Sequence, residues 1–248
     1  MDPTDDIRIG KVTEAWAKNA KLLVRYHEQL ASTSTWAKER AFDEEVMSQP
    51  IAIYLTDYQT GGRGRRTNTW TSTKPGSSLY TTFSFMAPMP SPTLSPIMGL
   101  AVFRAAFATW PFLPWSLKAP NDLYLGDKKV SGLLLENLSQ GQLNRLLVGF
   151  AINVFEAPED VSTATSMIDH FPENTALLGE DWTQFLDRLL LELTLAISTA
   201  SKESLESSEC VSILWALNLN PNLKEKYTQV LPDGTLIQGK KKISWTEL

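Results

Sequence analysis

The fold of this chain is decided by residues 115–154, which read WSLKAPNDLYLGDKKVSGLLLENLSQGQLNRLLVGFAINV. The stretch holds three apolar segments, namely Trp115–Lys118 with Leu123–Leu125, then Lys129–Leu138, then Leu143–Val154. The joints between them, Gly126-Asp127 and Ser139-Gln140-Gly141, are short and made of turn residues. Connections this brief join antiparallel neighbours, because a parallel crossover needs about a dozen residues or more. The pattern therefore predicts an antiparallel meander.

The residues upstream predict two more strands and two helices. Ile51–Tyr58 and Leu79–Met86 have the apolar composition of buried strands. The residues from Ser34 to Ser48 suit a helix with Thr35 as its N-cap. A second helix is expected to open at Ser95, with Pro96 in its first turn, and its apolar stripe of Leu100, Phe103, Phe107 and Trp110 is typical of core packing.

Downstream of the meander, Trp182 to Ile197 has the spacing of an amphipathic helix that covers one face of a sheet. After Ser201 the sequence becomes Ser-rich and then shows two short strand-like pieces, Tyr227–Leu231 and Thr235–Ile237, around the turn Pro232-Asp233-Gly234. The chain is thus predicted to be an α+β protein with a mixed, mostly antiparallel sheet flanked by helices and a small C-terminal β unit.

Composition excludes several classes of protein. The chain has 248 residues, 43% of them hydrophobic, and a net charge of -5. Cys210 is the only cysteine and His27 and His170 are the only histidines, so an internal disulfide is excluded, and a structural zinc site or a Ser-His-Asp triad is poorly supplied. The acidic pI disfavours a general nucleic-acid binder. An acidic N-terminus and the lack of an apolar run of about 20 residues predict a soluble, cytoplasmic protein that does not contact a membrane.

The first chemical motif is the loop Tyr58-Gln59-Thr60-Gly61-Gly62-Arg63-Gly64-Arg65-Arg66. Its glycines let the backbone bend and bring N–H groups close to a ligand, while each guanidinium matches phosphate or carboxylate oxygens. The loop therefore suggests an anion-binding site. A solvated basic surface loop would have the same composition and remains an alternative.

The second motif is Lys118-Ala119-Pro120-Asn121-Asp122, followed by Lys129 and Gly132. Pro120 forces the residue before it out of the helical region, so lysines, an amide and a carboxylate are displayed at a sheet end. Lys129 shares a strand face with Leu133, and a partly buried lysine needs an anionic partner such as a carboxylate or a phosphate. Ordinary turn chemistry could also account for the Asn-Asp pair.

The two motifs occur in this order in biotin protein ligases, and the chain resembles that family. The resemblance covers Ser32-Thr33, Gln59 to Trp70, Lys118 to Glu136, and Gly149 to Val154. It implies the fold shared by class II aminoacyl-tRNA synthetases and biotin ligases, with a catalytic domain over residues 1–206 and a small C-terminal β cap over residues 207–248. The combination of both motifs is more specific than either one alone.

The resemblance implies an ATP-dependent ligase that activates biotin as biotinyl-5'-AMP, with Mg²⁺ accompanying the ATP, and transfers it to a lysine of a biotin carboxyl carrier protein. The catalytic residues it implies are Lys129, Arg63 and Arg65. It assigns biotin binding to Ser32, Thr33, Gln59, Gly62, Arg63 and Gly132. Nucleotide contacts go to Arg65, Arg66, Trp70, Asn121, Lys129 and Asn153, and Mg²⁺ binding to Asp122. Trp70 could instead pack in the core, and Ser32-Thr33 could simply start a helix.

The chain also departs from the family pattern. Ser34, Thr67, Asn68 and Ala119 replace an asparagine, a glycine, an arginine and an aromatic residue that are usual there. Only 31 residues precede Ser32, too few for a winged helix-turn-helix, so we expect no binding to operator DNA. Family members often pair through sheet edges, which makes a homodimer one candidate assembly.

Two other functions stay open at this point. One is a lipoate- or octanoate-handling ligase or transferase of the same superfamily, although a thioester route would want a nucleophilic cysteine near the motifs. The other is a non-catalytic module that binds anions or single-stranded nucleic acid through the three arginines, Tyr58 and Trp70.

Overall fold

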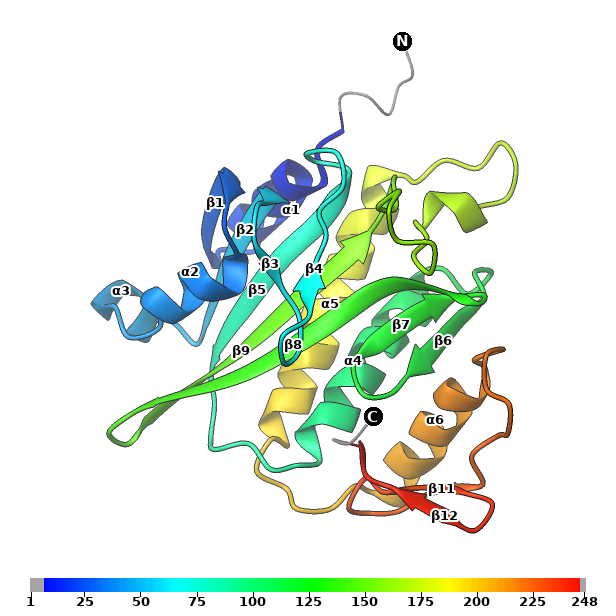
Figure 1. The fold of residues 1–248 in the computed structure, drawn as a ribbon. Coiled ribbons are helices and arrows are strands. Elements are labelled where there is room, and N and C mark those ends of the chain that lie inside the picture. The colour runs from blue at the N-terminus through cyan, green and yellow to red at the C-terminus, as the bar shows by residue number, and fades with distance from the viewer. Residues whose placement is uncertain (1–6, 246–248) are drawn as a thin grey trace. The chain divides into compact units, whose positions relative to one another are not determined.

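The structure of the protein is a computed structural model that describes residues 7–245. Its residues form two compact units. The first unit consists of Met1–Ala87 and Val130–Gly179, and the second of Pro88–Lys129 and Glu180–Leu248. The main sheet of the first unit has five strands, and the second unit carries the antiparallel hairpin β6-β7 (Figure 1). The main sheet is mixed and mostly antiparallel, and it is accompanied by a small separate sheet near the C-terminus, so the predicted fold class is confirmed.

The first unit holds its strands in the order β1-β2-β5-β9-β8. Its elements are α1 (Ile9–Asn19), β1 (Leu23–Leu30), α2 (Thr33–Glu39), α3 (Glu44–Met47), β2 (Ile51–Gln59), β3 (Gly62–Arg63), β4 (Thr69–Trp70), β5 (Ser78–Met86), β8 (Lys128–Gln140, whose first two residues belong to the second unit), β9 (Leu143–Asn153) and the 3-10 turn η1 (Ile168–His170). Only β1 and β2 run parallel, whereas β2-β5, β5-β9 and β9-β8 are antiparallel. The tight turn between β8 and β9 is the one predicted from the sequence.

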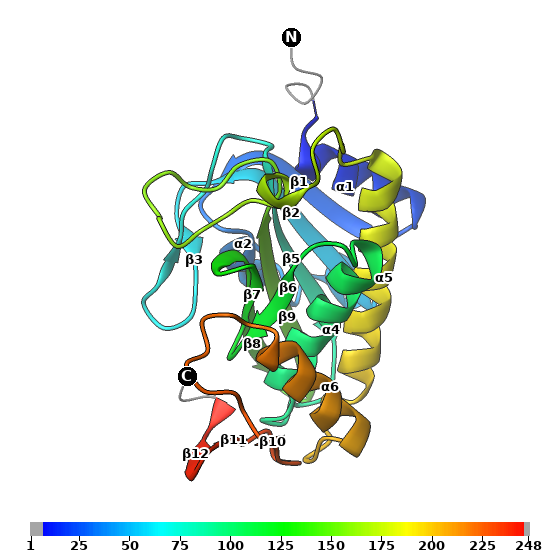
Figure 2. The same cartoon turned by 90° about the vertical axis from the view of Figure 1, so that its right-hand side faces the viewer.

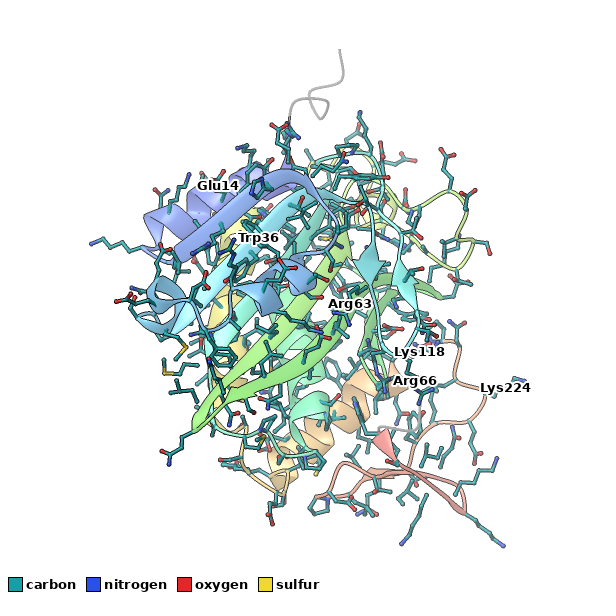
Figure 3. All side chains as sticks on the ribbon, turned by 60° about the vertical axis from the view of Figure 1, so that its left-hand side comes forward. Glu14, Trp36, Arg63, Arg66, Lys118 and Lys224 are labelled. Carbon is teal, nitrogen blue, oxygen red and sulfur yellow. The ribbon has the colours of Figure 1, made fainter. Side chains whose placement is uncertain are left out.

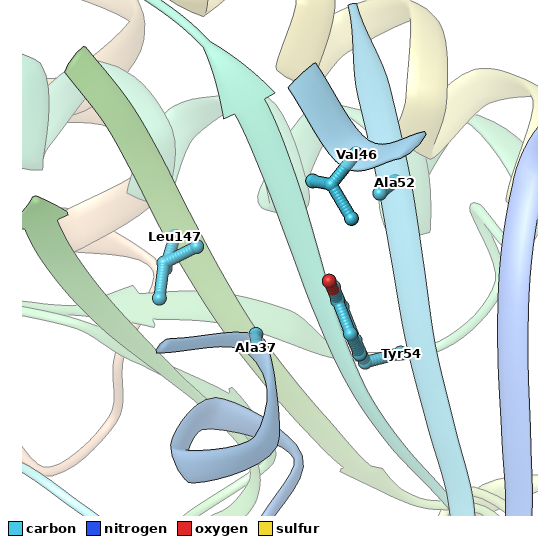
Figure 4. Packing of buried hydrophobic residues seen from close by; sticks show 5 residues of the cluster. All are labelled: Ala37, Val46, Ala52, Tyr54 and Leu147. Atoms are coloured by element: carbon cyan, nitrogen blue, oxygen red, sulfur yellow. The ribbon is translucent and has the colours of Figure 1, made fainter. Parts of the chain in front are cut away.

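Helices pack on both faces of this sheet. Tyr54 of β2 is fully buried in a cluster that includes Ala37 of α2, Val46 of α3 and Leu147 of β9 (Figure 4). Successive residues of a strand point to opposite faces. Asp57, three positions further along β2, accordingly faces α1, where it packs so close to Gly10 that a Cβ there would lie 2.2 Å from its carboxylate oxygen.

The second unit combines three helices with the hairpin β6-β7 and the three-stranded sheet β10-β11-β12. Its elements are α4 (Leu94–Thr109), β6 (Trp115–Lys118), β7 (Asp122–Leu125), α5 (Gly179–Ser198), α6 (Ser207–Asn218), β10 (Gln229–Val230), β11 (Leu236–Gln238) and β12 (Lys241–Ile243). Figure 2 shows α4 beside α6, and the edge-to-face contact of Phe103 with Trp215 joins them. Trp110 packs against Trp182 and Phe185 of α5. The turn at Pro232-Asp233-Gly234 lies between β10 and β11 as predicted.

Two predictions about helices were wrong, and two helices were not predicted. The single helix expected from Ser34 to Ser48 is interrupted between Glu39 and Glu44, and it begins at Thr33 with Ser32, not Thr35, at its N-cap. The helix expected to open at Ser95 has Thr93 as its N-cap. The Ser-rich segment after Ser201 contains helix α6, which was not predicted. Helix α1 and strand β1 were also missing from the prediction. Between residues 7 and 245, no helix is both long and apolar enough to cross a membrane.

Candidate active site

A buried hydrogen-bond network links α2 to the sheet in the first unit. The backbone N–H and the hydroxyl of Thr33 both donate to Oε1 of Gln59, at 2.9 and 3.3 Å. Thr82 of β5 donates in turn to the Thr33 hydroxyl, at 2.9 Å. All three side chains are less than a tenth exposed. The network fixes the first turn of α2 and the end of β2 relative to each other, with neutral polar groups rather than charges.

The sheet beside this network carries small residues. Thr82 lies opposite Gly149 of β9, and Gly132 of β8 lies opposite Ala151, two positions further along β9 and therefore on the same face. A Cβ at Gly149 would lie 3.3 Å from the Cβ of Leu134 and 3.8 Å from the Thr82 hydroxyl. The glycines thus keep this face small around the Thr82 hydroxyl, with Leu134 as the larger neighbour of Gly149.

Ser32 occupies the N-cap position of α2 without capping the helix. Its backbone is extended, and no side-chain hydrogen bond caps the first turn. Its hydroxyl instead lies 3.3 Å from that of Ser34, and the side chains of both residues are buried. A helix-start role alone does not account for a buried hydroxyl that caps none of the helix N–H groups.

The glycine-arginine loop is an ordered hairpin. Gly62 pairs with Trp70 and Arg63 with Thr69, so β3 and β4 form a two-stranded sheet of their own. The turn closes with hydrogen bonds from Gly64 N to Asn68 O, at 2.9 Å, and from Asn68 N to Arg65 O, at 3.0 Å. Figure 3 shows Arg63 and Arg66 on this hairpin, and Arg66 has a left-handed backbone with φ of 55°. The backbone that carries the arginines therefore has a defined hairpin conformation.

Gly62 lies at the closest approach between the hairpin and the buried network. A Cβ there would lie 2.4 Å from the carbonyl oxygen of Trp70 and 3.2 Å from Nε2 of Gln59. Gln59 is also held through its backbone N–H, which donates to the Ser72 hydroxyl at 3.0 Å. Glycine is required at position 62 for steric reasons, because it lets the hairpin lie against Gln59.

Arg63 contacts an acidic residue that the sequence did not suggest as part of the site. Its Nη2 lies 3.3 Å from Oε1 of Glu136 on β8, and the same oxygen lies 2.5 Å from Nζ of Lys38 on α2. The Glu136 side chain is 16% exposed, against 40% for Arg63. Cations from the hairpin and from α2 thus share one carboxylate.

The second unit carries the other motif on the β6-β7 hairpin. Asp122, the first residue of β7, places Oδ1 2.7 Å from Nζ of Lys129, so the partly buried lysine has the anionic partner that its position required. Asn121 lies in the turn before β7, next to Pro120, which follows a cis peptide bond. The Trp245 indole N–H donates to the carbonyl oxygen of Pro120 at 2.9 Å. The side chain of Trp245 thereby ties residues near the C-terminus to this turn.

Lys118 lies beside two tyrosines. Its Nζ donates to the Tyr124 hydroxyl at 3.0 Å. This hydrogen bond raises the pKa of the Lys118 ammonium, while burial acts in the opposite direction. Burial raises the pKa of Tyr227. Tyr227 therefore stays a neutral phenol, and Lys118 keeps its charge.

Asn153 ends β9 in the first unit with a buried side chain. Its Nδ2 donates to the carbonyl oxygen of Thr165 at 3.1 Å, and its Oδ1 has no hydrogen-bond partner within residues 7–245. The Thr165 segment is held by Asp169, which accepts hydrogen bonds from the N–H and the hydroxyl of Ser166. Burial alone would raise the pKa of Asp169, but these hydrogen bonds lower it below the ordinary value.

The structure therefore brings part of the predicted site together. Thr33, Gln59, Gly62 and the residue at the N-cap, Ser32, lie around one network, while Arg63 reaches Glu136. Asp122 and Lys129 are in contact in the second unit. Whether the two sets face one ligand stays a prediction. Three residues that contact the predicted set directly or through Glu136 were missed from the sequence, namely Lys38, Thr82 and Glu136.

Comparison with known proteins gives the same family as the motifs. The model of the biotin/lipoate A/B protein ligase family matches residues 26–153. The chain is 27% identical over 159 residues to the bifunctional ligase/repressor BirA of Bacillus subtilis. The aligned residues make up 62% of this chain and 46% of BirA. The chain is 29% identical over 147 residues to the biotin–[acetyl-CoA-carboxylase] ligase of Mycobacterium tuberculosis, covering 57% and 52%.

A solved structure extends the likeness over most of the chain. The biotin protein ligase from Aquifex aeolicus in complex with biotin and ATP is 26% identical, with a TM-score of 0.64 over 90% of this chain and 95% of that one. The chain spans about half the length of the curated relatives it matches. Since the family model covers more than half of its residues, the chain belongs to the biotin/lipoate A/B protein ligase family.

Proposed function

We propose that this protein is a biotin protein ligase that forms biotinyl-5'-AMP and pyrophosphate from biotin and ATP, and then passes the biotinyl group to a lysine of a carrier protein with release of AMP. The observation that carries the proposal is the buried network of Thr82, Thr33 and Gln59 against Gly62 of the arginine hairpin. The Aquifex relative, solved with biotin and ATP, has the same fold. The ureido ring of biotin is neutral, and neutral donors and acceptors are what this network offers.

The first step requires cations. Attack of a carboxylate on a polyphosphate brings like charges together, and two such charges about 4 Å apart repel by about 4 kcal/mol at an effective dielectric near 20. We assign Lys129 to the biotin carboxylate and the α-phosphate, and Arg63 to the phosphate side. The Asp122 carboxylate lies 2.7 Å from Nζ of Lys129 and so fixes the direction of the lysine side chain.

The remaining residues have binding roles in this proposal. Arg65 and Arg66 would close the hairpin over the adenylate and exclude water from the mixed anhydride. Trp70 would stack on the adenine, while Asn121 and Asn153 would contact the nucleotide. The buried Oδ1 of Asn153, which has no partner between residues 7 and 245, supports a ligand contact there.

Asp122 is the residue that would hold Mg²⁺. Within residues 7–245 no three His, Cys, Asp or Glu side chains are grouped to hold a metal ion by themselves. Mg²⁺ that arrives with ATP needs only one or two protein carboxylates besides phosphates and water, so a single carboxylate fits it. When bound, the ion would neutralise charge on the phosphates. Asp122 would then face both the ion and Lys129.

Cys210 argues against the thioester alternative. It lies on α6 in an apolar pocket lined by Leu205, Leu214 and Val230, among others. Burial raises the pKa of its thiol, which lowers the fraction of nucleophilic thiolate at neutral pH. A transferase that carries its acyl group on cysteine would need the opposite shift.

The test is to incubate the protein with biotin, ATP and Mg²⁺, look for biotinyl-5'-AMP by mass spectrometry, and then add a biotin carrier domain. Lys129→Ala should abolish adenylate formation, whereas Lys128→Ala, which removes the exposed neighbour with the same charge change, should keep it. Parallel reactions with lipoate and octanoate separate the ligases of the superfamily. Adenylate formed at the wild-type rate by Lys129→Ala would exclude the assigned mechanism, and oligonucleotide binding that falls steeply with salt, without any adenylate, would favour the non-catalytic module.

A further inference from the structure

The carboxylate of Glu136 is shared unequally between two cations. Its Oε1 lies 2.5 Å from Nζ of Lys38 and 3.3 Å from Nη2 of Arg63. Its Oε2 is buried and has no hydrogen-bond partner within residues 7–245. Lys38 is therefore the closer partner, and Arg63 makes the longer and more exposed contact.

The contact matters because Arg63 is the arginine that the proposed function assigns to phosphate. A guanidinium held by a resident carboxylate has to leave it, at least in part, to bind the oxygens of a ligand. Leaving a partly buried carboxylate without an ion-pair partner costs free energy, and this cost would oppose that exchange. Lys38 removes the obstacle, because Glu136 stays paired when Arg63 leaves.

Lys38 is well placed for this role. It lies on α2, the helix whose first turn is fixed to Gln59 through Thr33. Glu136 lies on β8 four residues beyond Gly132, so both are on the same face of the strand. Neither α2 nor β8 has to move for Arg63 to change partners, because the arginine is carried by the separate β3-β4 hairpin.

We propose that Glu136 is an internal anion that holds Arg63 in the ligand-free protein and releases it to the phosphates of the nucleotide, with Lys38 keeping the carboxylate paired. The proposal rests on the proposed function, since it needs an anionic ligand at Arg63. Lys38 and Glu136 are then positioning residues, which act through Arg63 and do not touch the nucleotide. The exchange makes nucleotide affinity depend on the strength of an intramolecular ion pair.

The proposal predicts changes of opposite sign for two partners of one ion pair. Glu136→Gln removes the competing anion and should lower the Kd for ATP, measured by calorimetry, by about three- to fivefold, as expected for a partly exposed ion pair. Lys38→Met leaves Arg63 as the only ion-pair partner of Glu136 among residues 7–245 and should raise that Kd by a similar factor. General damage to the fold would weaken binding in both variants, so thermal stability is recorded for each.

The double variant decides how Lys38 acts. If Lys38 works only through Glu136, Lys38→Met in the Glu136→Gln background should leave the Kd at the value of Glu136→Gln alone. A weakened affinity in both backgrounds would mean that Lys38 contacts ATP itself, and the proposal would be wrong. The controls are Glu45→Gln and Lys18→Met, which break the ion pairs Arg25–Glu45 and Lys18–Glu14 with the same changes in net charge.

The outcomes separate this inference from the proposed function. Opposite shifts in the two single variants, with silent controls, support it. Shifts of the same sign, or none, in a protein that binds ATP and biotin refute the role of Glu136 and leave the ligase assignment intact. A wild-type protein that binds neither ligand refutes both.

Discussion

Gly62→Ala tests whether the contact of the arginine hairpin with Gln59 is needed for catalysis. The new methyl group would lie 2.4 Å from the backbone oxygen of Trp70, 3.1 Å from the Trp70 Cβ and 3.2 Å from Nε2 of Gln59. An overlap with backbone cannot be relieved by a side-chain rotation, so the β3-β4 ladder has to open. Forcing a methyl group into such a space costs about 1–3 kcal/mol.

That energy should displace the hairpin rather than unfold the protein. The β3-β4 pair is a two-stranded sheet of its own, so we expect a fall in melting temperature of about 2–4 °C or less, which corresponds to about 1 kcal/mol for a chain of this size. Displacing Arg63 by about 1 Å should lower biotin-dependent ATP–pyrophosphate exchange by about 10- to 100-fold.

The matched control is Gly61→Ala. Its methyl group would meet only the carbonyl oxygen of Ala31, at 3.6 Å, which is an ordinary contact. Exchange should therefore stay within about twofold of wild type, as is usual for a substitution without a steric conflict. Equal activities in the two variants would refute the reasoning, because the single structural difference between them is the overlap at position 62.

Three further predictions concern the first unit. Thr82→Val removes the hydroxyl that donates to Thr33 and should weaken biotin binding by about fivefold in calorimetry, whereas Thr81→Val, which removes a hydroxyl without a partner within residues 7–245, should not. Arg145→Leu should lower the free energy of unfolding in urea by about 3 kcal/mol or more, because the fully buried guanidinium donates to carbonyl oxygens of Ser84, Val46 and Gln49. Asp169→Asn should lower the melting temperature at pH 7, and the difference should disappear in acid, because a carboxyl whose folded-state pKa is lowered loses its contribution as the pH falls through that pKa. A difference that persisted in acid would exclude this origin.

Strands β8 and β9 were predictable because their apolar sequence and the turn residues between them agree with their burial and antiparallel pairing. Turns at Gly126-Asp127 and Ser139-Gln140-Gly141 allow only antiparallel pairing, and the register between β8 and β9 follows. The parallel pair β1-β2 was not predictable in this way, because the short segment from Leu23 to Leu30 is half exposed and lacks an alternating apolar pattern.

The helices show what local sequence leaves undecided. Residues 34–48 contain no glycine or proline, so nothing marks the interruption after Glu39. Helix α6 did carry a start signal, because Glu206 and Glu209 form a capping box three residues apart. The preceding serines obscured it, since they are typical of linkers as well as of helix N-termini.

The motif residues of the site came from the resemblance, whereas their partners required the fold. Glu136 is an ordinary strand residue in the sequence, and its contacts come from residues 98 and 73 positions away, Lys38 and Arg63. No local sequence pattern indicates ion pairs between residues so far apart in the chain. Thr82 was missed for the same reason, since its role depends on the helix that packs above β5.

The hydrogen bond from Trp245 to Pro120 has a consequence for biosynthesis. The turn that carries Asn121 and Asp122 is made early by the ribosome, but the indole that satisfies its backbone carbonyl is translated 125 residues later. Until then the turn lacks one of its native partners. A nascent chain, or a protein shortened before residue 245, would therefore carry this motif in a less restrained state than a chain that includes Trp245.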